Sequence, residues 1–437
     1  MKVLKFGGTS VGTAARMKDV AQLINDGTQK LIVLSAMSGT TNGLIEISDY
    51  FYKNNQAGAL ERVNMLEQKY DAIIDELYSS EDSKKEAKKQ LSANFDLIRS
   101  HSKSVFTLFE EKAILAQGEL ISTAMFQLYL KEQGINSVHL PALDFMRIDK
   151  NAEPDTLFIA ENLNKLLTAS PDAEMYITQG FICRNFYGEI DNLQRGGSDY
   201  TASLVGAAIK SEEIQIWTDI NGIHNNDPRY VENTKPVPVL HFEEAAELAY
   251  FGAKILHPTC ILPAKLSNIP VRLLNTMEPT APGTLISTTS KKGKIESVAA
   301  KDNITAIKIK SGRMLLAYGF LRKIFEIFES HHTSIDMITT SEVGVSVTID
   351  NTKNLDNILN DLKKFGMVTV DRNMVIICVV GDLPFENVGF QAKVIGALKQ
   401  IPIRMISYGG SNYNISFLIR AEDKKEALNA LSRALFD

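Results

Sequence analysis

The chain opens with two short apolar runs separated by a helical pattern, and this arrangement restricts the fold more than any other feature. Residues 3–6 and 31–34 are rich in branched side chains, whereas residues 13–25 show the period of an amphipathic helix. Two such runs joined by a helix are typical of a βαβ unit with parallel strands. The sequence therefore predicts an α/β fold.

Further strand-like runs at 137–140, 175–179 and 214–217, and a helix expected over 200–210, continue this alternation to about residue 290. Between about residues 44 and 115 the apolar period changes to three and four residues, which predicts a helical subdomain. The apolar residues that carry this period are Leu60, Val63, Leu66, Tyr70, Ile73, Ile74, Leu77, Leu91, Phe95, Ile98, Val105 and Phe109.

A polar, glycine-containing stretch at 287–294 is typical of a linker, so we expect the first domain to span residues 1–290. Residues 304–372 then show a βαββαβ pattern, and a second copy begins at 373 but lacks one strand. Residues 296–303 could supply that strand. We therefore expect a second domain at 304–372 that is inserted into a third, made of 296–303 and 373–437.

The composition favours a small-molecule partner. The 47 basic and 52 acidic residues give a net charge of -5, so the basic excess expected of a nucleic-acid-binding protein is missing. The three cysteines are far apart in the sequence, which supports neither a disulfide framework nor a zinc site. The sequence also lacks an apolar run of about 18 residues, as a membrane span would need. We expect a cytoplasmic protein that binds neither nucleic acid nor membrane.

Three glycine-bearing turns could hold phosphate or carboxylate groups. Residues 5–10, Lys-Phe-Gly-Gly-Thr-Ser, follow the first strand, and residues 35–42 follow the second. Glycines let backbone N–H groups approach a phosphate, and Lys5 adds a cation, although the spacing is not that of a Walker loop. In residues 195–201 an arginine could grip a carboxylate, four residues before an acid. Ordinary turns and helix caps remain the alternatives at all three places.

Two later segments add candidate residues. Residues 217–229 follow a strand and are dense in turn formers, so this loop could surround a nucleotide and offer Arg229 to its phosphates. Residues 251–258 contain Lys254, a second candidate cation. A solvated loop and a surface lysine are the alternatives.

Together these five motifs, in this order, resemble those of the aspartokinases in the amino-acid kinase family. The resemblance covers nearly the whole chain. It implies a three-layer α/β/α amino-acid kinase sandwich followed by two ferredoxin-like ACT domains, which bind amino acids. It also implies transfer of the γ-phosphoryl of ATP, used with Mg, to the β-carboxylate of L-aspartate.

The resemblance assigns roles by matched position. Lys5 and Lys254 would act at the transferring group, and Asp199 would orient them. ATP would contact Lys5, Gly7, Gly8, Thr218, Asp219, Arg229 and Lys254. Aspartate would contact Ser35, Thr41, Glu119, Arg195 and Ser198. His224 stands where similar proteins often have tyrosine, so the contact with the base stays open, and the resemblance names no metal ligands.

The resemblance further implies feedback inhibition by lysine through the first ACT domain and a homodimer built through these domains. The matched effector residues are Met314, Gly319, Phe320, Leu321, Ser334, Asp336, Thr340, Ser341 and Glu342. Because Ala317 replaces a serine found in some lysine-sensitive members, threonine is the alternative effector. Without the resemblance, Gly319 would be a helix-start turn and Asp336 a solvated strand residue.

Two other functions remain open. A kinase of the same fold could act on glutamate, carbamate or a nucleotide. Alternatively, the chain could be an amino-acid-binding regulator whose kinase domain has lost activity.

Overall fold

A computed structural model describes the chain except for residues 104, 194–195, 253–256, 290–292, 313–317 and 437. The described residues form two compact units. The first contains residues 1–223 and 256–289, and the second contains 224–255 and 290–437. The segment 224–255, which we expected within the first domain, therefore packs with the second unit.

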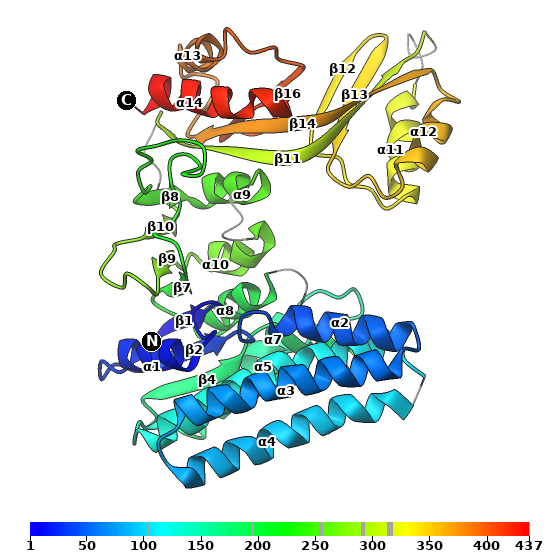
Figure 1. Cartoon of the computed structure of the whole chain (residues 1–437). Helices are drawn as coiled ribbons and strands as arrows, with labels where there is room; N and C mark the ends of the chain where they lie inside the picture. Colours follow the sequence, from blue (N-terminus) through cyan, green and yellow to red (C-terminus); the bar gives the residue numbers. More distant parts are fainter. Residues whose placement is uncertain (104, 194–195, 253–256, 290–292, 313–317, 437) are drawn as a thin grey trace. The chain divides into compact units, whose positions relative to one another are not determined.

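The first unit is built on a largely parallel sheet (Figure 1). Its strands are β1 (Lys2–Phe6), β2 (Lys30–Leu34), β3 (Ser137–His139), β4 (Met175–Gln179), β7 (Ile214–Thr218), β9 (Val271–Asn275) and β10 (Thr284–Ser287). They lie in the order β3-β4-β2-β1-β7-β9-β10, and only β10 among them is known to run antiparallel to its neighbour β9. The predicted βαβ unit is confirmed, because β1 and β2 are parallel and flank α1 (Ala14–Ile24). A separate hairpin pairs β5 (Ile182–Arg184) with β6 (Ile190–Asn192).

Four long helices form the predicted helical subdomain. They are α2 (Thr40–Tyr52), α3 (Gln56–Leu77), α4 (Glu81–Ser100) and α5 (Leu108–Glu132), and they lie side by side in Figure 1. Six residues of the expected apolar period on α3 are buried, from Val63 to Leu77. Val105 and Phe109 are exposed instead. Val105 lies between the short 3₁₀ turn η1 (His101–Lys103) and α5, and Phe109 lies in the first turn of α5.

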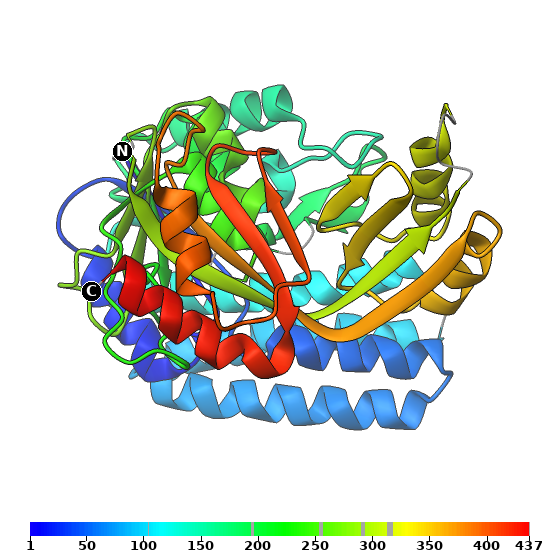
Figure 2. The same ribbon diagram turned by 90° about the horizontal axis from the view of Figure 1, so that it is seen from above.

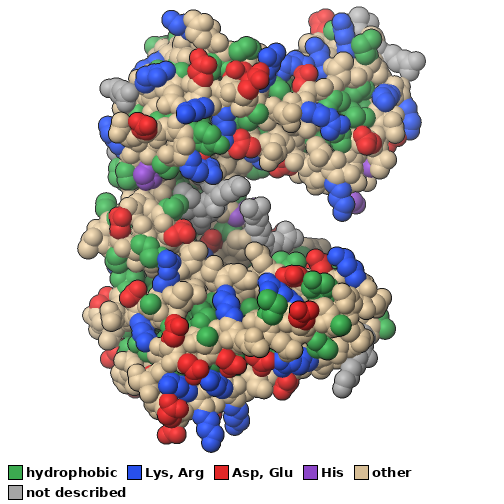
Figure 3. Space-filling view, viewed as in Figure 1, with side chains coloured by type: hydrophobic (Ala, Val, Ile, Leu, Met, Phe, Trp, Pro, Cys, Tyr) green, Lys and Arg blue, Asp and Glu red, His purple; other side chains and the backbone are tan. Residues whose placement is uncertain are grey.

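The remaining helices of the first unit are shorter. They are α6 (Ala142–Phe145), α7 (Thr156–Thr168), α8 (Gly197–Ala208), η2 (Pro258–Ile261) and α10 (Leu262–Leu266). On the face of the first unit drawn in Figure 3, acidic and basic side chains are interspersed over the long helices. In the described part of the chain, every helix is too short or too polar to cross a lipid bilayer.

The second unit contains a six-stranded antiparallel sheet in the order β12-β13-β11-β14-β16-β15. Its strands are β11 (Ile295–Lys310), β12 (Ile338–Ser341), β13 (Gly344–Ile349), β14 (Met367–Gly381), β15 (Met405–Tyr408) and β16 (Asn414–Arg420). Its helices are α9 (Phe242–Tyr250), α11 (Phe320–Ser330), α12 (Leu355–Leu362), α13 (Phe390–Ala397), η3 (Ala421–Asp423) and α14 (Lys424–Leu435), and β8 (Val239–His241) precedes α9.

Two long strands join the two βαββαβ copies in this unit (Figure 2). The first half of β11 pairs with the second half of β14, with Val298 beside Val379, and its second half pairs with the first half of β14, with Ile309 beside Val368. Residues 296–300 thus supply the strand that the second copy lacks, as predicted. The last strand of the first copy and the first strand of the second copy, which the sequence places on either side of residue 373, are one continuous strand, β14. Each copy has its own hydrophobic core, one beneath α13 and α14 and one beneath α11 and α12.

Candidate active site

Four parallel strands of the first unit end at one edge of the sheet. The register places Phe6 beside both Leu34 and Trp217, and Leu34 beside Gln179. Ligands of open parallel sheets bind at the carboxyl ends of the strands. The turns that follow β1, β2 and β4 therefore meet where a ligand is expected.

The turn after β1 needs glycine because other backbone passes close to it. A Cβ atom at Gly8 would lie 2.7 Å from the carbonyl oxygen of Ala36, in the turn after β2. The N–H of Ser38 donates to the Gly8 carbonyl at 3.1 Å, so the two turns are joined. A Cβ atom at Gly7 would be in ordinary van der Waals contact with the Nζ of Lys5, at 3.5 Å, and would cover part of it. The glycines therefore keep space open beside this ammonium group.

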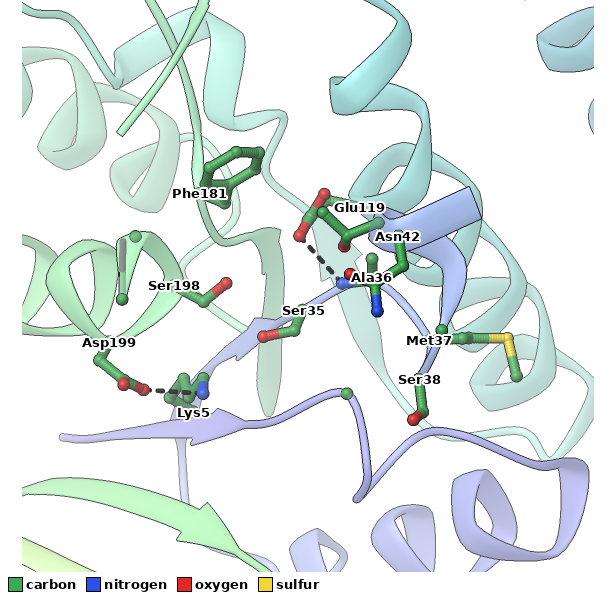
Figure 4. A pocket seen from close by; sticks show the side chains of 15 residues that line it. Lys5, Ser35, Ala36, Met37, Ser38, Asn42, Glu119, Phe181, Ser198 and Asp199 are labelled. Carbon is green, nitrogen blue, oxygen red and sulfur yellow. Dashed lines mark hydrogen bonds and ion pairs between the residues drawn. The ribbon is translucent and has the colours of Figure 1, made fainter. Parts of the chain in front are cut away.

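Strand alternation brings Lys5 to α8. Leu4 and Phe6 belong to the core that includes α1 to α5, and successive side chains of a strand point to opposite faces. The Nζ of Lys5 lies 2.7 Å from the Oδ1 of Asp199, in the first turn of α8, and the two side chains are 11% and 13% exposed (Figure 4). The Asp199 carboxylate thus holds the Lys5 ammonium at the sheet edge. Because little water reaches this pair, the electrostatic interactions of the ammonium are stronger there than in bulk water.

The N-terminus of α8 is held by close packing. Gly196 precedes the helix in a left-handed conformation with φ of 77°, and a Cβ atom there would lie 2.7 Å from the Cys260 sulfur. The Cys260 thiol donates to the Gly196 carbonyl at 3.2 Å. A Cβ atom at Gly180 would lie 2.5 Å from the Cβ of Ser198. The turn after β4 therefore packs directly against the first turn of α8. The first N–H groups of a helix have no intrahelical acceptor and favour an anion.

Glu119 reaches the site from the middle of α5. Its side chain is buried, and its Oε1 accepts from the Ala36 N–H at 3.1 Å. Its Oε2 has no hydrogen-bond partner among the described residues. Burial raises the pKa of Glu119 to about 7, although the Ala36 N–H and the charge of Lys5 act in the opposite direction. A carboxylate with an unsatisfied oxygen in this environment gains from a cationic partner.

These groups line one cavity of about 350 Å³ (Figure 4). The predicted residues in its wall are Lys5, Gly8, Ser35, Thr41, Glu119, Ser198 and Asp199. The cavity therefore combines a cation, two carboxylates and the N-terminus of a helix, which suits a zwitterionic ligand next to a phosphoryl group.

The comparisons with known proteins agree with this geometry. The profile of the amino acid kinase family matches residues 1–275, and an ACT domain profile matches residues 377–435. Lysine-sensitive aspartokinase 3 of Escherichia coli (strain K12) is 33% identical over 448 residues, which cover 100% of this chain and 99% of the relative. The chain belongs to the aspartokinase family.

Two solved aspartokinase structures have the same fold over the whole chain. E. coli aspartokinase III in complex with aspartate and ADP gives a TM-score of 0.85 at 33% identity, with 100% of both chains covered. The aspartate kinase of Clostridium acetobutylicum gives a TM-score of 0.85 at 27% identity and the same coverage. The predicted amino-acid kinase sandwich with ACT domains is thereby confirmed.

One residue of the cavity wall was missed by the sequence analysis. Phe181 has φ of 67°, in the left-handed region. This backbone conformation costs a residue other than glycine about 1–2 kcal/mol. Its N–H donates to the Oγ1 of Thr201 at 3.0 Å, and its carbonyl accepts from the Leu193 N–H at 2.7 Å. These two hydrogen bonds, to Thr201 of α8 and from Leu193 just after β6, fix the backbone of Phe181. The ring is thereby kept in the cavity wall. The available signal was a Gly-Phe pair directly after a strand that ends at the site.

The residues that the resemblance assigns to the nucleotide belong to both units, and the described ones are each placed within their own unit. Thr218 ends β7 and its hydroxyl donates to Asp219 at 3.2 Å, at the same sheet edge as Lys5. Arg229 belongs to the second unit. Arg195 and Lys254 lie outside the described residues.

The loop that carries Arg229 also contains His224. The ring Nδ1 of His224 lies 2.8 Å from the Thr234 hydroxyl, and burial lowers the pKa of the imidazole. Arg229 itself forms a two-point ion pair with Asp227, with its Nη2 2.6 Å from Oδ2, and its side chain is 75% exposed. The exposed guanidinium is therefore accessible to a phosphate.

The effector residues that the aspartokinase resemblance names surround the start of α11 and the β12–β13 turn. Gly319 precedes α11 with φ of 78°, Phe320 begins the helix, and Leu321 is exposed. Ser334, Thr340, Ser341 and Glu342 are exposed, and Met314 lies outside the described residues.

Asp336 is not a solvated strand residue, because β12 begins only at Ile338 and the Asp336 side chain is 2% exposed. Its Oδ1 accepts from the Lys301 ammonium at 2.6 Å and from the Tyr250 hydroxyl at 3.0 Å. Its Oδ2 has no hydrogen-bond partner among the described residues. Asp336 therefore binds one ammonium group, and its second carboxylate oxygen is buried and unsatisfied within the described part of the chain.

Proposed function

We propose that the chain transfers the γ-phosphoryl group of ATP to the β-carboxylate of L-aspartate, giving 4-phospho-L-aspartate and ADP. This reaction would begin lysine, threonine and methionine biosynthesis. The observation that carries the proposal is the cavity in which the Lys5–Asp199 pair and Glu119 meet the start of α8. The relative solved with aspartate and ADP supports the choice of ligands.

In the proposed reaction, a β-carboxylate oxygen attacks the γ-phosphorus in line. The bond between this phosphorus and the β,γ-bridging oxygen breaks, and ADP leaves with the electron pair. The attacking carboxylate is already ionised at neutral pH, so it needs no general base. Lys5 stabilises the charge on the transferring group, Asp199 keeps the ammonium in place, and N–H groups of α8 donate to anionic oxygens.

Aspartate would be oriented by charge. Glu119 would bind its ammonium through the unsatisfied Oε2, and Arg195 would bind its α-carboxylate with two parallel hydrogen bonds. Ser35, Thr41 and Ser198 would contribute polar contacts. This arrangement leaves the β-carboxylate as the free end of the substrate, facing the phosphoryl donor.

The nucleotide would occupy the sheet edge next to this pocket. Gly7 and Gly8 would admit its phosphates, Lys254 would join Lys5, and Arg229 would contact a phosphate oxygen, while Thr218 and Asp219 would contact the nucleoside. No three His, Cys, Asp or Glu side chains of the described chain cluster closely enough to hold a metal ion. Mg²⁺ is commonly held by substrate phosphates with few protein ligands, and it neutralises phosphate charge when bound.

We place this reaction in the cytoplasm. The three cysteines are buried thiols that form no disulfide among the described residues, which agrees with a reducing compartment.

The chemical nature of the product tests the proposal. An acyl phosphate is an activated carboxylic acid, so hydroxylamine added to the reaction should trap it as a hydroxamate. We expect hydroxamate formation that depends on both ATP and L-aspartate and matches ADP release. ADP release without hydroxamate would contradict transfer to a carboxylate.

The raised pKa of Glu119 predicts a pH dependence for aspartate binding. Below about pH 7 the carboxyl group is largely protonated and cannot pair with the substrate ammonium, whereas above this pH it is ionised. We therefore expect the KM for aspartate to fall as the pH rises from 6 to 8. Glu119→Gln should raise this KM about tenfold through loss of a charge-assisted hydrogen bond, and should remove the pH dependence.

The same carboxyl predicts a change in stability. The folded state holds the proton of Glu119 more tightly than the unfolded state does, so its contribution lowers the free energy of unfolding as the pH rises from about 4.5 to about 7. Glu119→Gln should remove this decrease. A pH-independent difference in stability between wild type and Glu119→Gln would contradict the raised pKa.

We also propose that lysine inhibits the enzyme through the first ACT domain of a homodimer, with threonine as the alternative effector. The E. coli relative solved with lysine and aspartate supports this choice. A ligand ammonium would bind the free oxygen of Asp336, and the N–H groups at the start of α11 would bind its carboxylate. Inhibition requires only that lysine binds more tightly to the state that holds substrate poorly.

Replacing Asp336 should therefore weaken inhibition by lysine. We expect Asp336→Ala to raise the lysine concentration for half inhibition at least tenfold, because a charge-assisted hydrogen bond is worth roughly 1.5–3 kcal/mol. Asp336→Asn keeps an acceptor for Lys301 and controls for local disruption. Separate titrations with lysine and threonine measure the effect, and full lysine inhibition of both variants would contradict this role.

A further inference from the structure

The loop with the nucleotide candidate Arg229 is part of the second unit. The Asn225 N–H donates to the Lys235 carbonyl at 2.9 Å, and the Lys235 N–H donates to the Asn225 Oδ1 at 2.8 Å, which closes the loop at its base. The N–H of Val298 in β11 donates to the Asn225 carbonyl at 2.9 Å. The base of the loop is therefore anchored to β11, one of the two central strands of the six-stranded sheet.

The tip of the loop is bound to the last helix of the chain. Asn226 donates through its buried side-chain amide to the Leu428 carbonyl of α14 at 3.0 Å. In the opposite direction, the side-chain amide of Asn429 donates to the Tyr230 carbonyl at 3.0 Å. Val231 is 4% exposed and belongs to the same hydrophobic core as Leu428. Two hydrogen bonds and a buried side chain thus join the loop to α14 on both sides of Arg229.

A buried lysine completes this contact. Lys424, the first residue of α14, is 5% exposed, and its ammonium lies 2.8 and 2.9 Å from the two carboxylate oxygens of Asp302. The same ammonium lies 4.2 Å from the centre of the Tyr230 ring, and the Arg229 guanidinium lies 5.9 Å from that centre. Cations at such distances are attracted to an aromatic ring. The Tyr230 ring next to Arg229 is therefore held by a side chain of α14.

We propose that Asn429 and Lys424 of α14 are positioning residues for ATP binding, which act through the 226–230 loop on Arg229. The inference rests on the proposed function, because it takes Arg229 to be a phosphate contact. The proposal predicts that substitutions in α14 affect one substrate and not the other. A change in α14 alters the binding of ATP, whereas the aspartate pocket, whose described residues all belong to the first unit, keeps its affinity.

The test compares neighbouring residues of the full-length enzyme. We expect Asn429→Ala and Lys424→Ala each to raise the KM for ATP about fivefold, as for the loss of one hydrogen bond, with the KM for aspartate unchanged. Lys425→Ala is the matched control, because Lys425 is an exposed lysine on the same helix. Lys424→Arg should restore the KM for ATP, since arginine keeps both the ion pair and the cation over the ring.

Two further measurements separate positioning from folding. Amide hydrogen exchange in residues 226–231 should quicken in Asn429→Ala while the melting temperature stays within a few degrees of wild type. Arg229→Ala should raise the KM for ATP, and adding Asn429→Ala to it should cause little further change, because both act through one contact.

The outcomes distinguish the inference from the proposal on which it rests. If Arg229→Ala raises the KM for ATP but the α14 variants behave like Lys425→Ala, the inference is overturned and the nucleotide assignment stands. If Arg229→Ala leaves the KM for ATP unchanged, the nucleotide assignment itself is wrong, and the inference is overturned with it. If the α14 variants raise the KM for ATP and the KM for aspartate by the same factor, the inference is also overturned, because such a change indicates a general disturbance of the fold.

Discussion

Replacing Lys5 with alanine is expected to lower kcat by about a hundredfold, since a cation that stabilises a developing charge contributes on the order of 3 kcal/mol. The Lys5 ammonium lies at the sheet edge beside Gly7 and is nearly buried, so water replaces its charge poorly. Because the interaction strengthens in the transition state, the effect should fall on kcat more than on either KM.

Lys2→Ala is the matched control for this change, because Lys2 is an exposed lysine of the same strand. Steady-state kinetics with both substrates measure the difference. If Lys5→Ala retains near-normal kcat in a folded protein, Lys5 is not the catalytic cation.

Asp199→Asn is expected to lower kcat by about thirtyfold, because it removes a charge-assisted contact worth roughly 2 kcal/mol that holds the Lys5 ammonium in place. The oxygen of Asp199 is 2.7 Å from the Lys5 nitrogen, and asparagine keeps the size of the side chain while losing its charge. Since both residues act through one ammonium, Asp199→Asn should add little to the loss in Lys5→Ala.

The control for Asp199 is a second lysine–aspartate pair in the same unit. Lys112 lies 2.6 Å from Asp191, whose side chain is 9% exposed. Asp191→Asn should therefore lower the melting temperature without a comparable loss in kcat. If the two aspartate variants lower kcat equally, the effect of Asp199 is one of stability and not of catalysis.

The spacing of apolar residues predicted the order of strands and helices, because it depends on which face of each strand or helix is buried. It also predicted that residues 296–300 complete the second βαββαβ copy, because the second copy has one strand fewer than the first. It could not show that 224–255 packs with the second unit. That arrangement depends on contacts such as Asn226 with Leu428, which are 202 residues apart in the sequence.

The site was predictable where its residues follow strand ends. The turns after β1 and β2 carry glycine and hydroxyl residues, and parallel strands bring such turns together. Glu119 lies in the middle of α5, where no turn marks it, so only the resemblance identified it. The left-handed Phe181 and the partners of Asp336 escaped prediction because both depend on tertiary packing.

The proposed acceptor of the phosphoryl group is the β-carboxylate of aspartate. The most direct test measures kcat/KM for ATP-dependent ADP release with L-aspartate, L-glutamate, carbamate and a nucleoside monophosphate as alternative acceptors. We expect the kcat/KM for L-aspartate to exceed that for every other acceptor by at least about a hundredfold, because an acceptor of different length or charge leaves the buried Glu119 carboxylate unpaired or misplaces the attacking oxygen. An equal or higher kcat/KM with another acceptor, or no turnover with aspartate in a folded protein, would contradict it.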